Sequence, residues 1–267
     1  MEATPQTNPP VIEQETPFVF SDFNKVFAFA IILYSIFIGV FDYIPSVVTF
    51  VDGLHPSIQF LIQYGFQFII MFFPLWIFVI DKYGANLKQF GFQKVKISKL
   101  AITVALTYIC YFVFSLIFAA IMNAQKVELP GYEAQDPYLP LFGGDNIGLI
   151  IAVFFIVFVA PFFEELFFRG FIYRVFRKTW STWLASILTA LLFALIHFQL
   201  NSFIPLFFLG ILLNFVYQHT KSVWTAVAFH MLNNSIAFGI EIFLYYNTDY
   251  FDAVSAAASS LYVALML

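Results

Sequence analysis

Residues 147–174 read IGLIIAVFFIVFVAPFFEELFFRGFIYR, a stretch longer than the ~20 apolar residues that a membrane-spanning helix needs. Two adjacent carboxylates, Glu164 and Glu165, and the guanidinium of Arg169 interrupt its apolar run. Ionisable side chains at membrane depth are costly, and they usually face the interior of a helix bundle or a wet cavity. The stretch therefore predicts a spanning helix with a functional site inside it.

The composition of the whole chain also indicates a membrane protein. Of its 267 residues, 61% are hydrophobic and only 10% are charged, and the mean hydropathy is +0.87. Soluble domains average about 25% charged residues. Hydrocarbon tolerates no unpaired backbone groups, and the apolar runs are continuous rather than alternating, so they predict helices and not a barrel. We expect an all-α, polytopic transmembrane bundle of seven or eight spanning helices, at about 26–44, 58–80, 100–122, 147–174, 182–200, 203–218, 222–246 and, more weakly, 254–267.

The positions of the basic residues predict the orientation. Lysines and arginines crowd residues 82–99 and 169–178 and recur at Lys221, and short loops rich in such residues stay in the cytoplasm. Residues 1–24 are rich in proline and have no basic signal region, so we expect a disordered cytoplasmic tail before one transmembrane domain, 25–267. Lysine-rich, arginine-poor usage favours a bacterial plasma membrane. The net charge of −4 gives no indication of nucleic acid binding.

Helix geometry predicts that the polar residues meet. A turn near 178–181 joins two antiparallel spans, and Glu164 and His197 lie about equally far from it along the chain. His230 and Asn234 are four residues apart and share one helix face. We therefore expect these four groups around a water-filled pocket in the cytoplasmic half of the membrane. Glu165 and Arg169 form a favourable pair at i,i+4, which allows the simpler interpretation that they only neutralise each other.

Three motifs in this order resemble a known family. Glu164-Glu165-x-x-x-Arg169, Phe193-x-x-x-His197 and His230-x-x-x-Asn234 are similar to the motifs of the CAAX-protease and bacteriocin-processing family of intramembrane endopeptidases, also called the Abi family. The resemblance covers about residues 147–240 and implies a membrane-embedded helical peptidase. It implies that the catalytic residues are Glu164, Glu165, Arg169, His197, His230 and Asn234.

The resemblance implies a mechanism without a nucleophilic serine or cysteine. Glu164, aided by His197, would activate a water, and His230 with Asn234 would donate hydrogen bonds to the developing oxyanion. A zinc-dependent alternative stays open, since Glu164, His197 and His230 are the ligand types of a two-histidine, one-carboxylate site. We favour no cofactor, because the usual His-Glu-x-x-His helix is absent and Asn234 suits an oxyanion better than zinc.

The expected substrate is a peptide or protein that approaches from the cytoplasmic half of the bilayer. In the family that the motifs resemble, eukaryotic members remove the last three residues of prenylated proteins. Bacterial members are linked to bacteriocin maturation or immunity. A second class therefore stays open, an immunity or scaffold protein without essential proteolysis. A transporter is disfavoured, because the two halves show no corresponding repeats. The sequence leaves the oligomeric state open.

Overall fold

The structure is a computed structural model, and it describes residues 16–125, 138–200 and 202–247. These residues form helices and connecting turns, with no strand among them. The α-helices are α2 (Phe20–Phe41), α3 (Pro45–Asp52), α4 (Pro56–Leu75), α5 (Ile97–Gln125), α6 (Asn146–Ala152), α7 (Ala160–Glu165), α8 (Tyr173–Thr179), α9 (Thr182–Leu195), α10 (Phe203–Thr220) and α11 (Val223–Tyr246). The predicted all-α bundle is confirmed.

Wider helical turns join some of these helices into longer rods. A π-helical segment, Trp76–Asp81, extends α4. Two others, Val153–Val159 and Leu166–Ile172, join α6, α7 and α8 into one helix. Such turns are common at functional sites, and the second one begins directly after Glu165.

Six of these rods are long and apolar enough to cross a membrane: Phe20–Phe41, Pro56–Asp81, Ile97–Met122, Asn146–Thr179, Phe203–Thr220 and Val223–Tyr246. The span expected at 182–200 is shorter, because α9 ends at Leu195. The residues that follow form a turn, which carries His197. Helices α9 and α10 thus form a hairpin. The weak span expected at 254–267 lies outside the described residues.

Part of the expected disordered tail is ordered. Residues 16–24 are described, and α2 begins at Phe20. The side chain of Phe18 is fully buried, and Lys178 Nζ donates to the carbonyls of Thr16 and Phe18, at 2.7 Å each. Asp22 accepts a hydrogen bond from Lys82 Nζ at 2.6 Å. These partners come from distant parts of the chain, so local composition gave no sign of them. Residues 1–15 lie outside the described part.

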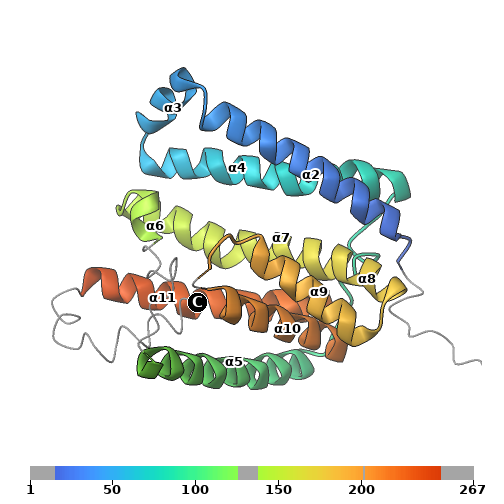
Figure 1. Ribbon diagram of the computed structural model, residues 1–267. Coiled ribbons are helices and arrows are strands. Elements are labelled where there is room, and N and C mark those ends of the chain that lie inside the picture. The colour runs from blue at the N-terminus through green and yellow to red at the C-terminus, as the bar shows by residue number, and fades with distance from the viewer. Residues whose placement is uncertain (1–15, 126–137, 201, 248–267) are drawn as a thin grey trace, which may run out of the picture.

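The helices form two groups (Figure 1). Helices α2 and α4 lie side by side, and a second group contains the long α6–α8 helix, the α9–α10 hairpin, α11 and α5. The hairpin packs closely, because a Cβ placed on Gly210 of α10 would come within 2.9 Å of Ala190 of α9.

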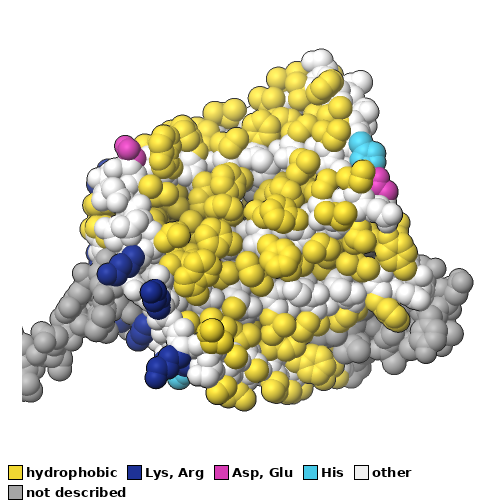
Figure 2. All heavy atoms as spheres, turned by 180° about the vertical axis from the view of Figure 1, so that it is seen from behind, with side chains coloured by type: hydrophobic (Ala, Val, Ile, Leu, Met, Phe, Trp, Pro, Cys, Tyr) yellow, Lys and Arg dark blue, Asp and Glu magenta, His cyan; other side chains and the backbone are white. Residues whose placement is uncertain are grey.

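Opposite ends of the bundle carry different side chains. Figure 2 shows an apolar surface with lysines and arginines gathered at one end, and a histidine at the other. Contacts link the basic segments at their shared end: Lys99 Nζ donates to the carbonyl of His219 at 2.9 Å. We call this the basic end, and the opposite one the α3 end. The prediction that the basic clusters lie on one side of the membrane agrees with this arrangement.

Candidate active site

Three of the predicted site residues converge on one oxygen atom. Oε2 of Glu164, on α7, lies 4.0 Å from Nε2 of His197 and 3.9 Å from Nε2 of His230. His197 follows the end of α9, and His230 lies on α11. The prediction that Glu164 and His197 lie level with each other, at equal distances along the chain from the turn after α8, therefore agrees with this contact. Oε2 is buried and has no hydrogen-bond partner among the described residues.

The ring orientation of His197 is set by a carbonyl group of α9, the helix that precedes it. Its Nδ1 lies 2.6 Å from the carbonyl oxygen of Phe193, four residues earlier. A carbonyl oxygen only accepts, so Nδ1 carries the hydrogen and donates it. In the neutral ring, Nε2 then presents a lone pair toward Glu164.

His230 has the same orientation for a different reason. Its Nδ1 donates to Oε1 of Glu165 at 2.9 Å, and the same oxygen accepts from Arg169 Nη1 at 2.9 Å. A carboxylate that accepts from Nδ1 fixes the tautomer and the orientation of the ring. The predicted Glu165–Arg169 pair is confirmed, and it does more than neutralise charge, because Glu165 also holds His230.

Arg169 is fully buried, and the second group of helices supplies its remaining partners. Its Nη2 donates to the carbonyl of Gly210 at 3.0 Å, and its Nε donates to Oδ1 of Asn214 at 3.3 Å. Asn214 in turn donates to the carbonyl of Ser186 on α9, at 3.0 Å. A buried ion is tolerated only when it is paired and hydrogen-bonded, and Arg169 meets that condition, whereas Oε2 of Glu165 has no hydrogen-bond partner among the described residues. Nothing in the motif spacing pointed to Asn214 or Gly210.

Asn234 lies beside the three converging residues rather than among them. Its Nδ2 donates to the carbonyl of Ile156 at 2.9 Å, which ties α11 to the π-helical turn before α7. A side-chain amide has two N–H groups, so one of them stays available for a further hydrogen bond. Asn234 lines the same cavity as His230.

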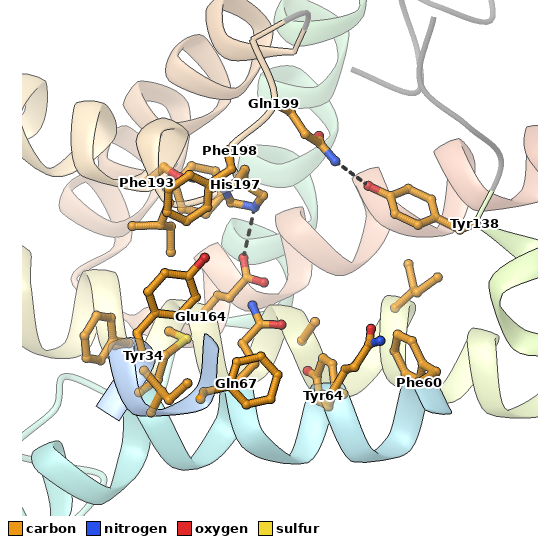
Figure 3. Close-up of a pocket in the computed structure, with 18 of the residues that line it drawn as sticks. Tyr34, Phe60, Tyr64, Gln67, Tyr138, Glu164, Phe193, His197, Phe198 and Gln199 are labelled. Atoms are coloured by element: carbon orange, nitrogen blue, oxygen red, sulfur yellow. Dashed lines mark hydrogen bonds and ion pairs between the residues drawn. The ribbon is translucent and has the colours of Figure 1, made fainter. Parts of the chain in front are cut away.

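A cavity of about 1120 Å³ opens in front of these residues, between the two helix groups. Glu164, His197, His230 and Asn234 contribute to its wall, together with residues of α2, α4 and α10. In Figure 3, Glu164 and His197 point toward each other, and Gln67 of α4 faces Glu164 from the opposite wall. The lining continues to Asp42, Val51 and Asp52, so the cavity reaches the α3 end.

Two contacts shape the cavity on the side of His197. Gln199 donates from Nε2 to the hydroxyl of Tyr138 at 3.1 Å (Figure 3). The residue between His197 and Gln199, Phe198, has a positive φ of 52°, which is uncommon for a residue with a side chain. Its ring stacks on Tyr34 of α2, with centroids 6.1 Å apart. The turn that carries His197 therefore contacts both α2 and the segment before α6.

The zinc alternative fits in chemistry but not in spacing. Each histidine uses Nδ1 for a hydrogen bond, which leaves Nε2 free to bind an ion. Zinc-binding histidines are oriented in the same way, by a hydrogen bond from the ring nitrogen that does not bind the metal. Ligand atoms around tetrahedral zinc are about 3.3 Å apart, given bonds of ~2.0–2.1 Å. The separations of 3.9 and 4.0 Å are wider. No group of three or more His, Cys, Asp or Glu within the described ranges is close enough to hold a metal ion.

Several polar residues of the cavity wall are not among the predicted site residues. Tyr34, Gln63, Tyr64, Gln67, Tyr138 and Gln199 all line the cavity. The available signal was a row of three amides, Gln59, Gln63 and Gln67, at four-residue intervals in a mainly apolar span.

The fold and this buried cluster define a polytopic membrane protein with a Glu-His site. Residues 146–236 match the family model of Rce1-like type II CAAX prenyl endopeptidases. This match agrees with the family that the three motifs resemble.

Two further comparisons add context. The chain is 30% identical over 103 residues to a protein of Escherichia coli described as "Uncharacterized 24.3 kDa protein". The match covers 36% of this chain and 48% of the relative, so the chain spans about half the length of the curated relative it matches. No solved structure gives a significant match.

Proposed function

We propose that this protein is an intramembrane endopeptidase that hydrolyses a peptide bond with a water activated by Glu164. The observation that carries the proposal is the position of Glu164 Oε2 between the Nε2 atoms of His197 and His230, at the wall of a large cavity. The match to the Rce1-like family model supports the same class of activity. A carboxylate near two imidazoles provides groups that take up and return protons during hydrolysis.

In the proposed reaction, Glu164 accepts a proton from water while the hydroxide attacks the carbonyl carbon. His197 assists, since its Nε2 faces Glu164 and accepts a proton. The breaking C–N bond then returns its electron pair to the nitrogen, which takes a proton from Glu164 or His197 and leaves as an amine. All atoms of the water end in the two products.

The developing oxyanion needs hydrogen-bond donors. The available N–H of Asn234 is one donor in this proposal. His230 is the second, and it donates from Nε2 only when its ring is protonated, because its Nδ1 hydrogen is directed to Glu165. The hydrogen bond from His230 to Glu165, which is itself paired with Arg169, gives Glu165 and Arg169 a positioning role in this proposal. We propose no metal step, given the spacing of the three donor atoms.

The direction of substrate access is also a proposal. If the basic end is cytoplasmic, the cavity reaches the outer side of the membrane through the α3 end. The lining thus favours access from the outer side, whereas the sequence suggested the cytoplasmic half. The substrate in this proposal is a peptide segment, and its identity is open.

Cleavage by the purified, detergent-solubilised protein tests the function. A quenched-fluorescence peptide library is incubated with the wild type and with Glu164→Gln, His197→Ala and His230→Ala, with and without a strong chelator. We expect a loss of at least about 100-fold in each variant, and no effect of the chelator. His219→Ala is the matched control, because this exposed histidine lies far from the cavity at the basic end.

Two outcomes would count against the proposal. Cleavage that survives Glu164→Gln in a folded protein would exclude Glu164 as the base. Failure of the wild type to cleave any library member would favour the immunity or scaffold function. Loss of activity with the chelator would instead support the zinc-dependent form of the enzyme.

A further inference from the structure

Two glutamines on α4 face the cavity and have no assigned role. Gln63 and Gln67 line it, and neither amide has a hydrogen-bond partner among the described residues. Gln59, one turn earlier on the same helix, differs, because its Nε2 donates to the carbonyls of Asp52 and Leu54. Its role is thus explained within the fold, and those of Gln63 and Gln67 are not.

The side chains of Gln63 and Gln67 are exposed. An amide that faced lipid without a hydrogen-bond partner would be unfavourable. The lipid-facing side of α4 instead carries residues such as Ile58, Leu61 and Ile69. The two glutamines are therefore polar where α4 meets the cavity, and the position of Gln67 in front of Glu164 suggests a ligand.

The spacing of the two amides fits a peptide main chain. Residues four apart in a helix are displaced by about 6 Å along its axis. Alternate residues of an extended peptide are about 6.6–6.8 Å apart and point the same way. Each glutamine amide offers both a donor and an acceptor, which is what one main-chain peptide unit requires.

We propose that Gln63 and Gln67 bind the main chain of an extended substrate and hold its scissile bond against Glu164. Gln67 faces Glu164 (Figure 3), so it binds closest to the scissile bond. Gln63 binds two residues farther along, toward the α3 end. Main-chain contacts do not depend on side-chain identity, so the substrate class is an extended segment with low sequence selectivity at these two residues.

This inference rests on the proposed peptidase function, and its test uses a peptide that the wild type cleaves. The cleavage products identify the scissile bond. A series of peptides is then made, each with one ester in place of one of the amides near that bond. An ester lacks the N–H that donates to a glutamine oxygen. The variants are Gln63→Met and Gln67→Met, which keep the length of the side chain, with Gln59→Met as the matched control.

We expect each cavity-facing variant to lower kcat/KM about five- to tenfold for the all-amide peptide. An ester at the backbone position that Gln67 binds lowers wild-type kcat/KM by a similar factor, but it does not lower kcat/KM further in Gln67→Met. An ester two residues away, at the position that Gln63 binds, lowers wild-type kcat/KM but does not lower it further in Gln63→Met. Gln59→Met cleaves like the wild type and responds to both esters.

The inference is overturned if Gln63→Met and Gln67→Met cleave like the wild type. It is also overturned if the ester and glutamine effects multiply at every position, because the glutamines then act on the fold alone. Both results leave the peptidase proposal standing, provided that Glu164→Gln abolishes cleavage. Cleavage that persists in Glu164→Gln, or a wild type that cleaves nothing, removes the peptidase proposal itself.

Discussion

Glu165 Oε1 lies 2.9 Å from His230 Nδ1, and both side chains are buried. The second member of the Glu-Glu pair thus contacts a histidine that is 65 residues away in the chain. The two adjacent glutamates have different surroundings, since Glu164 faces the cavity and Glu165 faces Arg169 and His230.

Glu165→Gln tests this division. The amide keeps the size of the side chain but removes the negative charge that lies beside His230 Nδ1. We expect kcat to fall about 10–100-fold, the size of effect seen when a carboxylate that orients a functional histidine is changed, with little change in KM. Steady-state kinetics on a cleaved peptide give both parameters. A change in KM alone would assign Glu165 to substrate binding.

Arg169→Met tests the buried ion cluster. The change removes the cation that is paired with Glu165 and leaves the buried carboxylate with its His230 contact alone, so we expect a loss of about 3–5 kcal/mol in the free energy of unfolding. Denaturant unfolding in detergent measures it. The double variant Arg169→Met/Glu165→Leu removes both charges and should recover most of the stability but not the cleavage. If the double variant is no more stable than Arg169→Met, the charge left on Glu165 is not the cause.

Gly210→Ala tests the close contact between α9 and α10. The added Cβ would lie 2.9 Å from Ala190 and would displace the carbonyl that accepts from Arg169. We expect destabilisation of about 1–3 kcal/mol. Gly239→Ala on α11 is the matched control, because nothing lies within 4 Å of its new Cβ. Equal melting temperatures for the two variants would contradict the packing argument.

Labelling of single cysteines in intact cells tests the orientation. Cys110, the only cysteine, is first changed to serine, and Asp52→Cys or Lys88→Cys is then introduced. Both positions are exposed, at the α3 end and the basic end respectively. A membrane-impermeant maleimide should label residue 52 before permeabilisation and residue 88 only after it. The reverse pattern would place the cavity mouth in the cytoplasm.

Periodicity and helix rise predicted the parts of the site that depend on positions within one helix or one hairpin. The i,i+4 spacing predicted the Glu165–Arg169 pair, and distance from the turn predicted that Glu164 and His197 lie at one depth. Contacts between separate helices were not predictable in this way. The bonds of Arg169 to Gly210 and Asn214 depend on how α10 packs, and no local pattern encodes that packing.

The expected helix boundaries were wrong where contacts with distant residues determine where a helix begins or ends. Residues 16–24 resemble a disordered tail in composition, yet Lys178 and Lys82 hold them in place. The early end of α9 depends on polar residues after Leu195 that find partners in other segments, such as Tyr138 for Gln199. The glutamines of α4 were missed because uncharged amides give only a weak signal in an apolar span.

The partners of Arg169 also bear on how the chain enters the membrane. Glu165 is on the same helix and is available as soon as that helix forms, whereas Gly210 and Asn214 follow 41 and 45 residues after Arg169. The pair therefore passes into the bilayer as a neutral unit, and its remaining hydrogen bonds form only when α10 has been inserted. The same two residues that orient a histidine in the finished protein thus lower the cost of inserting their own helix.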